Sequence, residues 1–417
     1  MITLIEALNY RSLKYISQPL GPFHVLIGPN ASGKSTFLDV VAFLGRLVSD
    51  GVEAAVRERT ENFVDLLWKR EGTRFELAIE AALPAEAQSS LGDNKFDTIR
   101  YEVAVGVMSD SSTEELGILH ERVFLKTANV VVPESRFVFP DLIDSPDTIL
   151  HKTKAKWQAV VSKNTSGNDN FTPEVRSKKK SWIHSFKLGP RKSALGNLPP
   201  DMTQFPGATW LKGQLTDGVQ LFILNSAVIR RPSPPNQRLG FRTDGSNLPW
   251  VVFDLVKLGR YDEWIRHLRT ALPDLKHVMP MLRPEDRHRY LMLEYENGMQ
   301  IPSWMASDGT LRMLALTLPA YVDNIKGIYL IEEPENGIHP NAVETVYQSL
   351  ASVYDAQLLM ASHSPVILGC ASPDVVMCFA KNDEGATDIV MGRNHPRLQE
   401  WQGETDLGTL FASGVLG

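Results

Sequence analysis

The chain has 417 residues, of which 43% are hydrophobic and 22% charged, a composition typical of globular proteins and not of disordered or fibrous ones. Its formal net charge of -6 gives no global basis for binding nucleic acid or an anionic membrane, so any such binding must be local. No apolar run reaches the roughly 18 residues that a membrane helix requires, and the first residues lack the regions of a signal peptide. We therefore expect a cytoplasmic protein without membrane association.

The chain has only two cysteines, Cys370 and Cys378. Two cysteines imply no disulfide framework, and a reducing compartment fits this usage. We expect both side chains to be small buried apolar groups without a redox or metal-binding role.

The first predicted unit is a strand, a loop and a helix. Residues 23–27 form a short apolar run that ends at Gly28. From residue 34 to residue 48, apolar side chains recur three or four positions apart, which is the spacing of one helix face.

The loop between this strand and helix matches the phosphate-binding pattern G-x-x-x-x-G-K-[ST]. Gly28 and Gly33 allow backbone conformations that a side chain would forbid, so that N–H groups can curl round phosphates. We expect Lys34 to bridge the β- and γ-phosphates of ATP, Ser35 to ligate Mg²⁺, and the helix to direct its positive end at the anion. The residues expected to contact ATP here are Gly28, Asn30, Ala31, Ser32, Gly33, Lys34, Ser35 and Thr36.

Alternating apolar and polar residues predict three antiparallel strands further along the chain. The alternation covers residues 74–80, 99–107 and 289–296. A strand of this pattern has one buried and one solvent-exposed face. We expect these strands to form a β-rich layer beside the nucleotide-binding fold.

Residues 152–212 are strongly basic and only weakly periodic, with three acidic residues in the whole stretch. We interpret this segment as an insertion. Lys178, Lys179 and Lys180 precede Trp182, and this mixture of charge and aromatic side chains suits nucleic-acid phosphates and bases. We favour a solvated surface excursion whose aromatic side chains dock it to the head, ahead of a surface for a protein partner and of nucleic-acid binding.

A second nucleotide strand is predicted at residues 328–331, which are apolar and end in Glu332 and Glu333. Neighbouring residues on a strand point to opposite faces, so the two carboxylates cannot share one role. A turn at the strand end would let Glu332 hold the magnesium shell while Glu333 polarises the attacking water. A solvated strand end with a chance acidic pair is the alternative.

The remainder of the chain alternates between helix and strand, as a mostly parallel α/β sheet requires. A helix is predicted at 341–353, and strands at 357–360 and 375–379. His363 follows the first of these strands, which should lie beside the acidic strand with its carboxyl end at the ligand crevice. A neutral imidazole there could contact the γ-phosphate or the water, although a lone histidine is more often structural.

Together, these motifs resemble the ABC-type ATPases of the SMC, RecF and OLD group, especially the OLD-like bacterial ATPases. The resemblance implies an α/β fold: an ABC-type P-loop ATPase head with a mixed or parallel core sheet, an antiparallel β layer and an inserted basic segment. It covers roughly the first 80 residues and the stretch from about 230 to 390. The matching segments are LNYRSL at 8–13, the phosphate loop at 28–36, DGSNL at 244–248, SDGTLR at 307–312, EEPENGIHP at 332–340 and HSP at 363–365.

The resemblance also implies a head-to-tail dimer around ATP, in which Lys34 and Glu333 of one subunit close against Ser307 and Gly309 of the other. A serine and backbone N–H groups at the start of a helix expected at 310–321 would form a second anion cradle. The alternative for Ser307 is a simple helix N-cap.

Further roles follow from the same resemblance. Glu333 and His363 would be catalytic, and Ser35 and Glu332 would bind Mg²⁺. Residues 335–337 would contact the other subunit. Arg11 would touch a phosphate or the partner, or would be an ordinary surface arginine.

The sequence departs from the family pattern in two places. The signature reads S-D-G-T where transporters have L-S-G-G-Q, and Glu332 stands where many relatives have aspartate. No glutamine can be assigned to a lid loop. These departures leave open how hydrolysis is triggered.

Three regions are predicted: an N-terminal ATPase lobe with the β layer at 1–150, the basic insertion at 151–225, and a C-terminal lobe at 226–417 that carries the helical part, the signature, the acidic strand and His363. The predicted function is an ATP-dependent ATPase that dimerises around ATP and regulates a separate effector, a nuclease, in bacterial antiviral defence. OLD-type relatives often carry a nuclease domain, and about 50 residues after His363 are too few for one. The alternatives are a RecF-like DNA-binding ATPase of repair or chromosome maintenance and, less favoured, a transporter's nucleotide-binding subunit.

Overall fold

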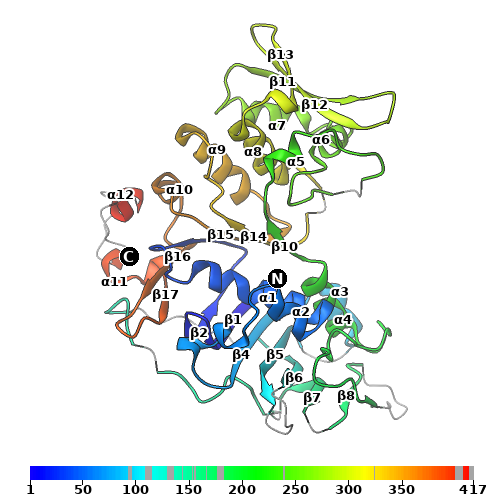
Figure 1. The fold of residues 1–417 in the computed structure, drawn as a ribbon, viewed down its shortest axis with the longest axis vertical. Helices are drawn as coiled ribbons and strands as arrows, with labels where there is room; N and C mark the ends of the chain where they lie inside the picture. Colours follow the sequence, from blue (N-terminus) through cyan, green and yellow to red (C-terminus); the bar gives the residue numbers. More distant parts are fainter. Residues whose placement is uncertain are drawn as a thin grey trace.

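A computed structural model describes most of the chain, and Figure 1 shows its three layers. An antiparallel sheet lies at the bottom of this view, a second sheet in the middle, and a helical lobe with a small sheet at the top. The structure describes residues 1–417 except 93–95, 109–114, 129–135, 143, 153, 155, 166, 176–182, 238–239, 324, 400–406 and 413–417.

The middle layer is a six-stranded sheet whose first five strands are parallel. Its last strand runs antiparallel to its neighbour. The predicted strands at 23–27, 328–331, 357–360 and 375–379 are confirmed as members of this sheet. In spatial order the strands are β10 (Val219–Phe222), β14 (Gly327–Glu332), β15 (Ala356–Ala361), β3 (Phe23–Ile27), β16 (Val376–Lys381) and β17 (Thr387–Met391).

Both faces of this sheet are buried, because successive side chains of a strand point to opposite sides. Ile328 and Leu330 of β14 belong to one hydrophobic core, whereas Tyr329 and Ile331 belong to another. Helix α1 (Lys34–Asp50) packs in the first core, and α9 (Pro340–Ala351) packs in the second. The apolar runs in the sequence reflect this double burial.

The bottom layer is an eight-stranded antiparallel sheet that contains two of the predicted strands, at 74–80 and 99–107. The prediction of a solvent-exposed face was wrong for both. Residues 148–151 cross the outer face, where the Ile149 and His151 N–H groups donate to the buried carboxylates of Glu76 and Glu102 at 2.8 Å. The strands in order are β2 (Leu13–Pro19), β1 (Ile2–Tyr10), β4 (Arg74–Ala82), β5 (Thr98–Met108), β6 (Glu115–Lys126), β7 (Gln158–Asn164), β8 (Asp169–Phe171) and β9 (His184–Phe186).

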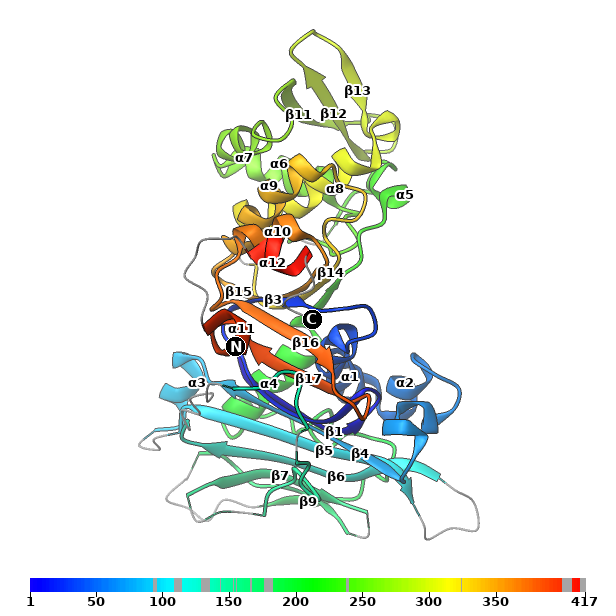
Figure 2. The same cartoon turned by 90° about the vertical axis from the view of Figure 1, so that its left-hand side faces the viewer.

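The third predicted strand of the β layer lies elsewhere. Residues 289–295 form β12 (Arg289–Tyr295), which pairs with β11 (Leu275–Leu282) and β13 (Gln300–Pro302) in the helical lobe. Figure 2 shows this small sheet at the end of the molecule remote from the eight-stranded sheet. Alternation predicts a strand but carries no information on which sheet the strand joins, so its assignment to the layer was wrong.

The segment interpreted as a basic insertion continues the N-terminal lobe. Strand β7 pairs with β6, and α4 (Pro206–Thr216) packs against α1. Lys163 is buried and donates to Asp169 at 3.0 Å, so part of the positive charge is structural. Lys178, Lys179 and Lys180 lie outside the described residues.

The helical lobe follows β10 in the chain and packs on the second core. The helix expected at 310–321 is α8 (Asp308–Thr317), which continues as a 3-10 turn at Leu318–Tyr321. In the part of the chain that the structure describes, no helix is long and apolar enough to cross a membrane. The remaining helices are α2 (Val52–Arg57), α3 (Ala85–Ser90), α5 (Ser226–Ile229), α6 (Leu248–Lys257), α7 (Tyr261–Leu268), α10 (Pro365–Cys370), α11 (Pro396–Gln399) and α12 (Leu407–Ala412).

The two cysteines have different environments. Cys378 on β16 is buried, as expected, and burial raises the pKa of its thiol to about 12. Cys370 at the end of α10 is exposed, so its predicted burial was wrong. Its helix turns this position away from the core.

Candidate nucleotide site

The phosphate loop joins β3 to α1 and depends on two glycines. Gly28 has φ 147° and Gly33 has φ 108°, conformations that side chains disfavour. A Cβ atom at Gly28 would lie 2.1 Å from the Phe379 carbonyl oxygen, and one at Gly33 would lie 2.2 Å from Thr387 Oγ1. Strands β16 and β17 therefore lie directly against the loop, and their close contact leaves no room for a side chain at Gly28 or Gly33.

Lys34 begins α1 and folds back over the loop. Its Nζ donates to the carbonyl oxygens of Gly28 at 2.8 Å and Pro29 at 2.9 Å. Loss of solvation lowers the pKa of Lys34 to about 8, although the nearby Glu333 and Glu332 raise it. The ammonium group is thus held inside the loop curve, where a phosphate would replace the carbonyl contacts.

The two carboxylates at the end of β14 diverge. Glu332 accepts a hydrogen bond from Ser35 Oγ at 2.7 Å. Glu333 has φ 46°, a left-handed turn, and its carboxylate accepts a hydrogen bond from the Asn336 side chain and lies 3.9 Å from His363 Nε2. The two side chains are therefore available for separate roles.

The oxygens of Ser35 and Glu332 suit Mg²⁺, which prefers hard oxygen ligands and usually takes only one or two from a protein. The remaining ligands of such an ion are phosphate oxygens and water. Accordingly, the described residues contain no cluster of three or more His, Cys, Asp or Glu side chains that could hold a metal alone. The donor set fits a nucleotide-dependent magnesium site.

His363 follows β15, which pairs in parallel with β14 and with β3. The predicted position of this strand beside the acidic strand is confirmed. Loss of solvation and the nearby Lys34 lower the pKa of His363 below its usual value, against the effect of Glu333 and Glu335. The lowered pKa favours the neutral imidazole.

A tether that the sequence did not reveal holds His363 in place. One carboxylate oxygen of Glu335 accepts hydrogen bonds from Ser362 Oγ and from the His363 backbone N–H, both at 2.8 Å. Glu335 was expected only to contact another subunit. Its spacing to His363 carried no signal, because the contact joins two loops that follow different strands.

Most of the predicted phosphate-side residues line one cavity of about 370 Å³. Three lining residues had no predicted role, namely Ser12, Ala361 and Lys381, and Arg11 had a phosphate contact as one of its alternatives. Arg11 has φ 51°, and its guanidinium donates to Asp39 at 3.2 Å. The full lining is Arg11, Ser12, Asn30, Ala31, Ser32, Gly33, Lys34, Ser35, Thr36, Glu332, Glu333, Ala361, His363 and Lys381.

Ser307 and Gly309 lie outside this cavity. Ser307 Oγ accepts a hydrogen bond from the Thr310 N–H at 3.1 Å and so caps α8. The space at Gly309 is closed by the Gly337 carbonyl oxygen, which would lie 2.6 Å from an added Cβ. Together with the start of α9 they line a separate cavity of about 490 Å³.

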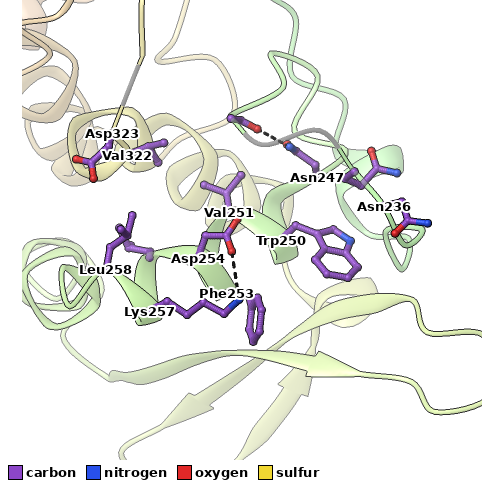
Figure 3. A pocket seen from close by; sticks show the side chains of 13 residues that line it. Asn236, Asn247, Trp250, Val251, Phe253, Asp254, Lys257, Leu258, Val322 and Asp323 are labelled. Atoms are coloured by element: carbon purple, nitrogen blue, oxygen red, sulfur yellow. Dashed lines mark hydrogen bonds and ion pairs between the residues drawn. The ribbon is translucent and has the colours of Figure 1, made fainter.

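Another cavity of about 490 Å³ opens beside α6 in the helical lobe (Figure 3). Trp250, Leu258 and Val322 contribute to its largely apolar lining, which also includes Asp254 and Asp323. It has none of the phosphate-side groups, and no residue of it was predicted to be functional.

Comparisons with known proteins agree with this fold. One solved structure, described as the SmcHead bound to the C-winged helix domain of ScpA, aligns with a TM-score of 0.51 at 14% identity, over 93% of this chain and 96% of that chain. A second, an Smc head domain with an extended coiled coil bound to the C-terminal domain of ScpA derived from Pyrococcus furiosus, gives 0.51 at 13% identity, over 93% and 95%. At such low identity the likeness shows the fold alone, which is that of an SMC-type ABC ATPase head.

No curated protein matches the sequence. A family model does, over residues 23–369, and this range contains the phosphate loop, the acidic strand and His363. Since the match covers more than half of the chain, the protein belongs to the AAA ATPase family described as "AAA domain, putative AbiEii toxin, Type IV TA system".

Proposed function

We propose that the protein is a Mg²⁺-dependent ATPase of the cytoplasm whose two copies close head to tail around ATP. One observation supports this most strongly: the phosphate-side groups and the Ser307 cradle lie in two separate cavities of the same chain. A second copy can bring its Ser307 to the open side of the first cavity, whereas the chain's own Ser307 does not line it.

The chemistry of the phosphate-side cavity is that of phosphoryl transfer to water. Glu333 accepts a proton from the attacking water, and the neutral His363 beside it donates a hydrogen bond to the γ-phosphate. Lys34 leaves its loop carbonyls for the phosphates. Ser35 and Glu332 would hold Mg²⁺, which would neutralise phosphate charge.

The Ser307 side supplies a second anion cradle. The N-terminus of α8 directs backbone N–H groups and the positive end of its dipole outward, and Ser307 remains exposed while it caps the helix. Capping and phosphate contact coexist because a hydroxyl has a donor and two acceptor sites. ATP would then join two subunits as well as serve as the substrate.

The proposed biological role is control of a separate effector, a nuclease, in bacterial antiviral defence. The family description, which names a putative AbiEii toxin and a type IV toxin–antitoxin system, supports a role of this kind. The DNA-binding alternative has less support, because the described part of the basic segment uses Lys163 and Arg191 in ion pairs with Asp169, Glu53 and Glu115. A pull-down with the products of neighbouring genes tests the effector, and failure of any partner to co-purify would contradict that part.

The dimer is tested with Glu333→Gln. Removal of the base stops hydrolysis while the phosphate contacts remain, so we expect this variant to elute as a dimer with MgATP and as a monomer without it. The kcat of Glu333→Gln should fall by about a thousandfold, because a general base contributes a rate enhancement of this order. Lys34→Ala is the control and should stay monomeric in both conditions. A Glu333→Gln monomer in the presence of saturating MgATP would contradict the head-to-tail proposal.

A further inference from the structure

The end of β16 brings a lysine to the phosphate-side cavity. Lys381 is the last residue of β16, is exposed, and lines the same cavity as Lys34 and His363. Strand β16 pairs with β3 on the side away from β15. Lys381 therefore approaches the phosphate loop from the side opposite to Glu333 and His363.

Its position relative to the loop is fixed by the neighbouring strand. Lys381 pairs across the β16–β17 ladder with Thr387. Thr387 Oγ1 lies 2.9 Å from the Ser32 carbonyl oxygen and 3.0 Å from Ser12 Oγ, and its N–H donates to the Ser12 carbonyl oxygen at 3.0 Å. The hairpin that carries Lys381 is thus hydrogen-bonded to the phosphate loop.

Among the residues that the structure describes, no hydrogen bond or ion pair involves the Lys381 ammonium group. The hairpin turn carries two acidic residues, Asp383 and Glu384, and Glu384 is paired with Lys14 at 2.7 Å. The other two cations of the cavity have partners: Lys34 binds the loop carbonyls, and Arg11 binds Asp39. Lys381 is an unpaired positive charge in a cavity expected to hold a polyanion.

We propose that Lys381 binds the α-phosphate of the nucleotide, an inference that rests on the proposed ATPase function. Glu333 and His363 place the γ-phosphate and the attacking water on the β14 side of the loop. The nucleotide then extends across the loop toward β16, where the α-phosphate meets the ammonium group. A lysine suits this role because it is a compact charge on a flexible stem.

The test is the affinity of Lys381→Gln for three ligands, MgATP, MgADP and AMP, measured by isothermal titration calorimetry. All three ligands carry the α-phosphate, so all should bind about tenfold or more weakly, by a common factor, when one charge-assisted contact is lost. Lys381→Arg should bind within about threefold of the wild type, because it keeps the charge.

Lys69→Gln is the matched control. It removes the same charge from Lys69, which acts on Glu384 of the same hairpin but does not line the cavity, so the affinities of this variant should not change. Equal affinities for Lys381→Gln and the wild type would overturn the proposal, as would a loss confined to MgATP, which would assign Lys381 to the γ-phosphate. If the wild type itself binds no nucleotide, the proposed ATPase function fails first, and Lys381 with it.

Discussion

Two helix starts in this protein face cavities, and they are built differently. Helix α1 begins after Gly33 without a side-chain cap, whereas α8 begins with Ser307 as its cap. The cavity at α1 is lined by lysines, an arginine, carboxylates and a histidine. The described lining of the cavity at α8 has no lysine, arginine, aspartate or glutamate.

Under the proposed function, each helix start would supply one part of a nucleotide site formed by two subunits. At α1 the backbone N–H groups are accompanied by Lys34, by the oxygens of Ser35 and Glu332, and by the carboxylate of Glu333 beside His363. At α8 the helix dipole is accompanied by the hydroxyls of Ser307 and Thr310, and Asp308 of its first turn is paired with Arg230. We therefore expect variants at the two helix starts to separate binding from catalysis.

The largest effect is expected at α1, for Lys34→Ala. Loss of an ammonium group that contacts two phosphates should weaken MgATP binding by about a hundredfold or more, since each charge-assisted hydrogen bond contributes about 1.5–3 kcal/mol. Calorimetric titration of the purified variant measures this. Retention of wild-type affinity would contradict the assignment of the phosphate loop.

The next effect is expected at α8, for Ser307→Arg. The bulky cation should keep this helix start from closing on a nucleotide bound by the partner subunit, so kcat should fall by about a hundredfold. MgATP affinity of the monomer should stay within about twofold, because Ser307 does not line the phosphate-side cavity. If Ser307→Arg also weakened MgATP binding by the monomer, the starts of α1 and α8 would not contribute separately to binding and catalysis.

Mixing the two variants sharpens this comparison. A dimer of one Lys34→Ala subunit and one Ser307→Arg subunit keeps one intact composite site, formed by the unmodified Lys34 and the unmodified Ser307. At equal amounts, random pairing should restore about a quarter of the wild-type turnover in a two-fold symmetric dimer. No recovery, with mixed dimers present by native mass spectrometry, would contradict composite sites.

A smaller effect concerns pH. The pKa of Lys34 is lowered to about 8, and a bound phosphate would raise it again. Binding is then favoured by the protonated form, so MgATP affinity should be constant below pH 8 and fall about tenfold for each unit above it. Calorimetric titration with MgATP in two buffers that differ in ionisation enthalpy should show that the protein takes up protons on binding near pH 8 and takes up none near pH 6.5. An affinity for MgATP that rises as the pH increases above 8 would contradict this prediction.

The smallest effect is expected for Ser307→Ala. The cap of α8 is lost, which should lower the free energy of unfolding by about 1 kcal/mol in urea titrations without nucleotide. Thr310→Val removes only a hydroxyl contact to Ser307 and should cost less. An unchanged stability of Ser307→Ala would mean that the hydroxyl contributes only to ligand contact.

Local patterns predicted much of the structure around the phosphate loop. The limits of β3 match the predicted strand, and α1 extends only two residues beyond the predicted helix. Strand β15 lies beside β14, as its motif order indicated. These elements were predictable because apolar periodicity and glycine positions act over a few residues.

The sequence by itself determined most of the segments that form strands and helices around the phosphate loop. It also determined which glycine, lysine and acidic residues lie at the ends of these elements. Only the tertiary structure decided that residues 289–295 join the small sheet, that residues 148–151 bury the outer face of β4 and β5, and that Lys381 lines the cavity. Each of these depends on contacts between segments far apart in the chain. A local pattern shows that a face is apolar or a residue is charged, but its neighbours are set by how the layers pack.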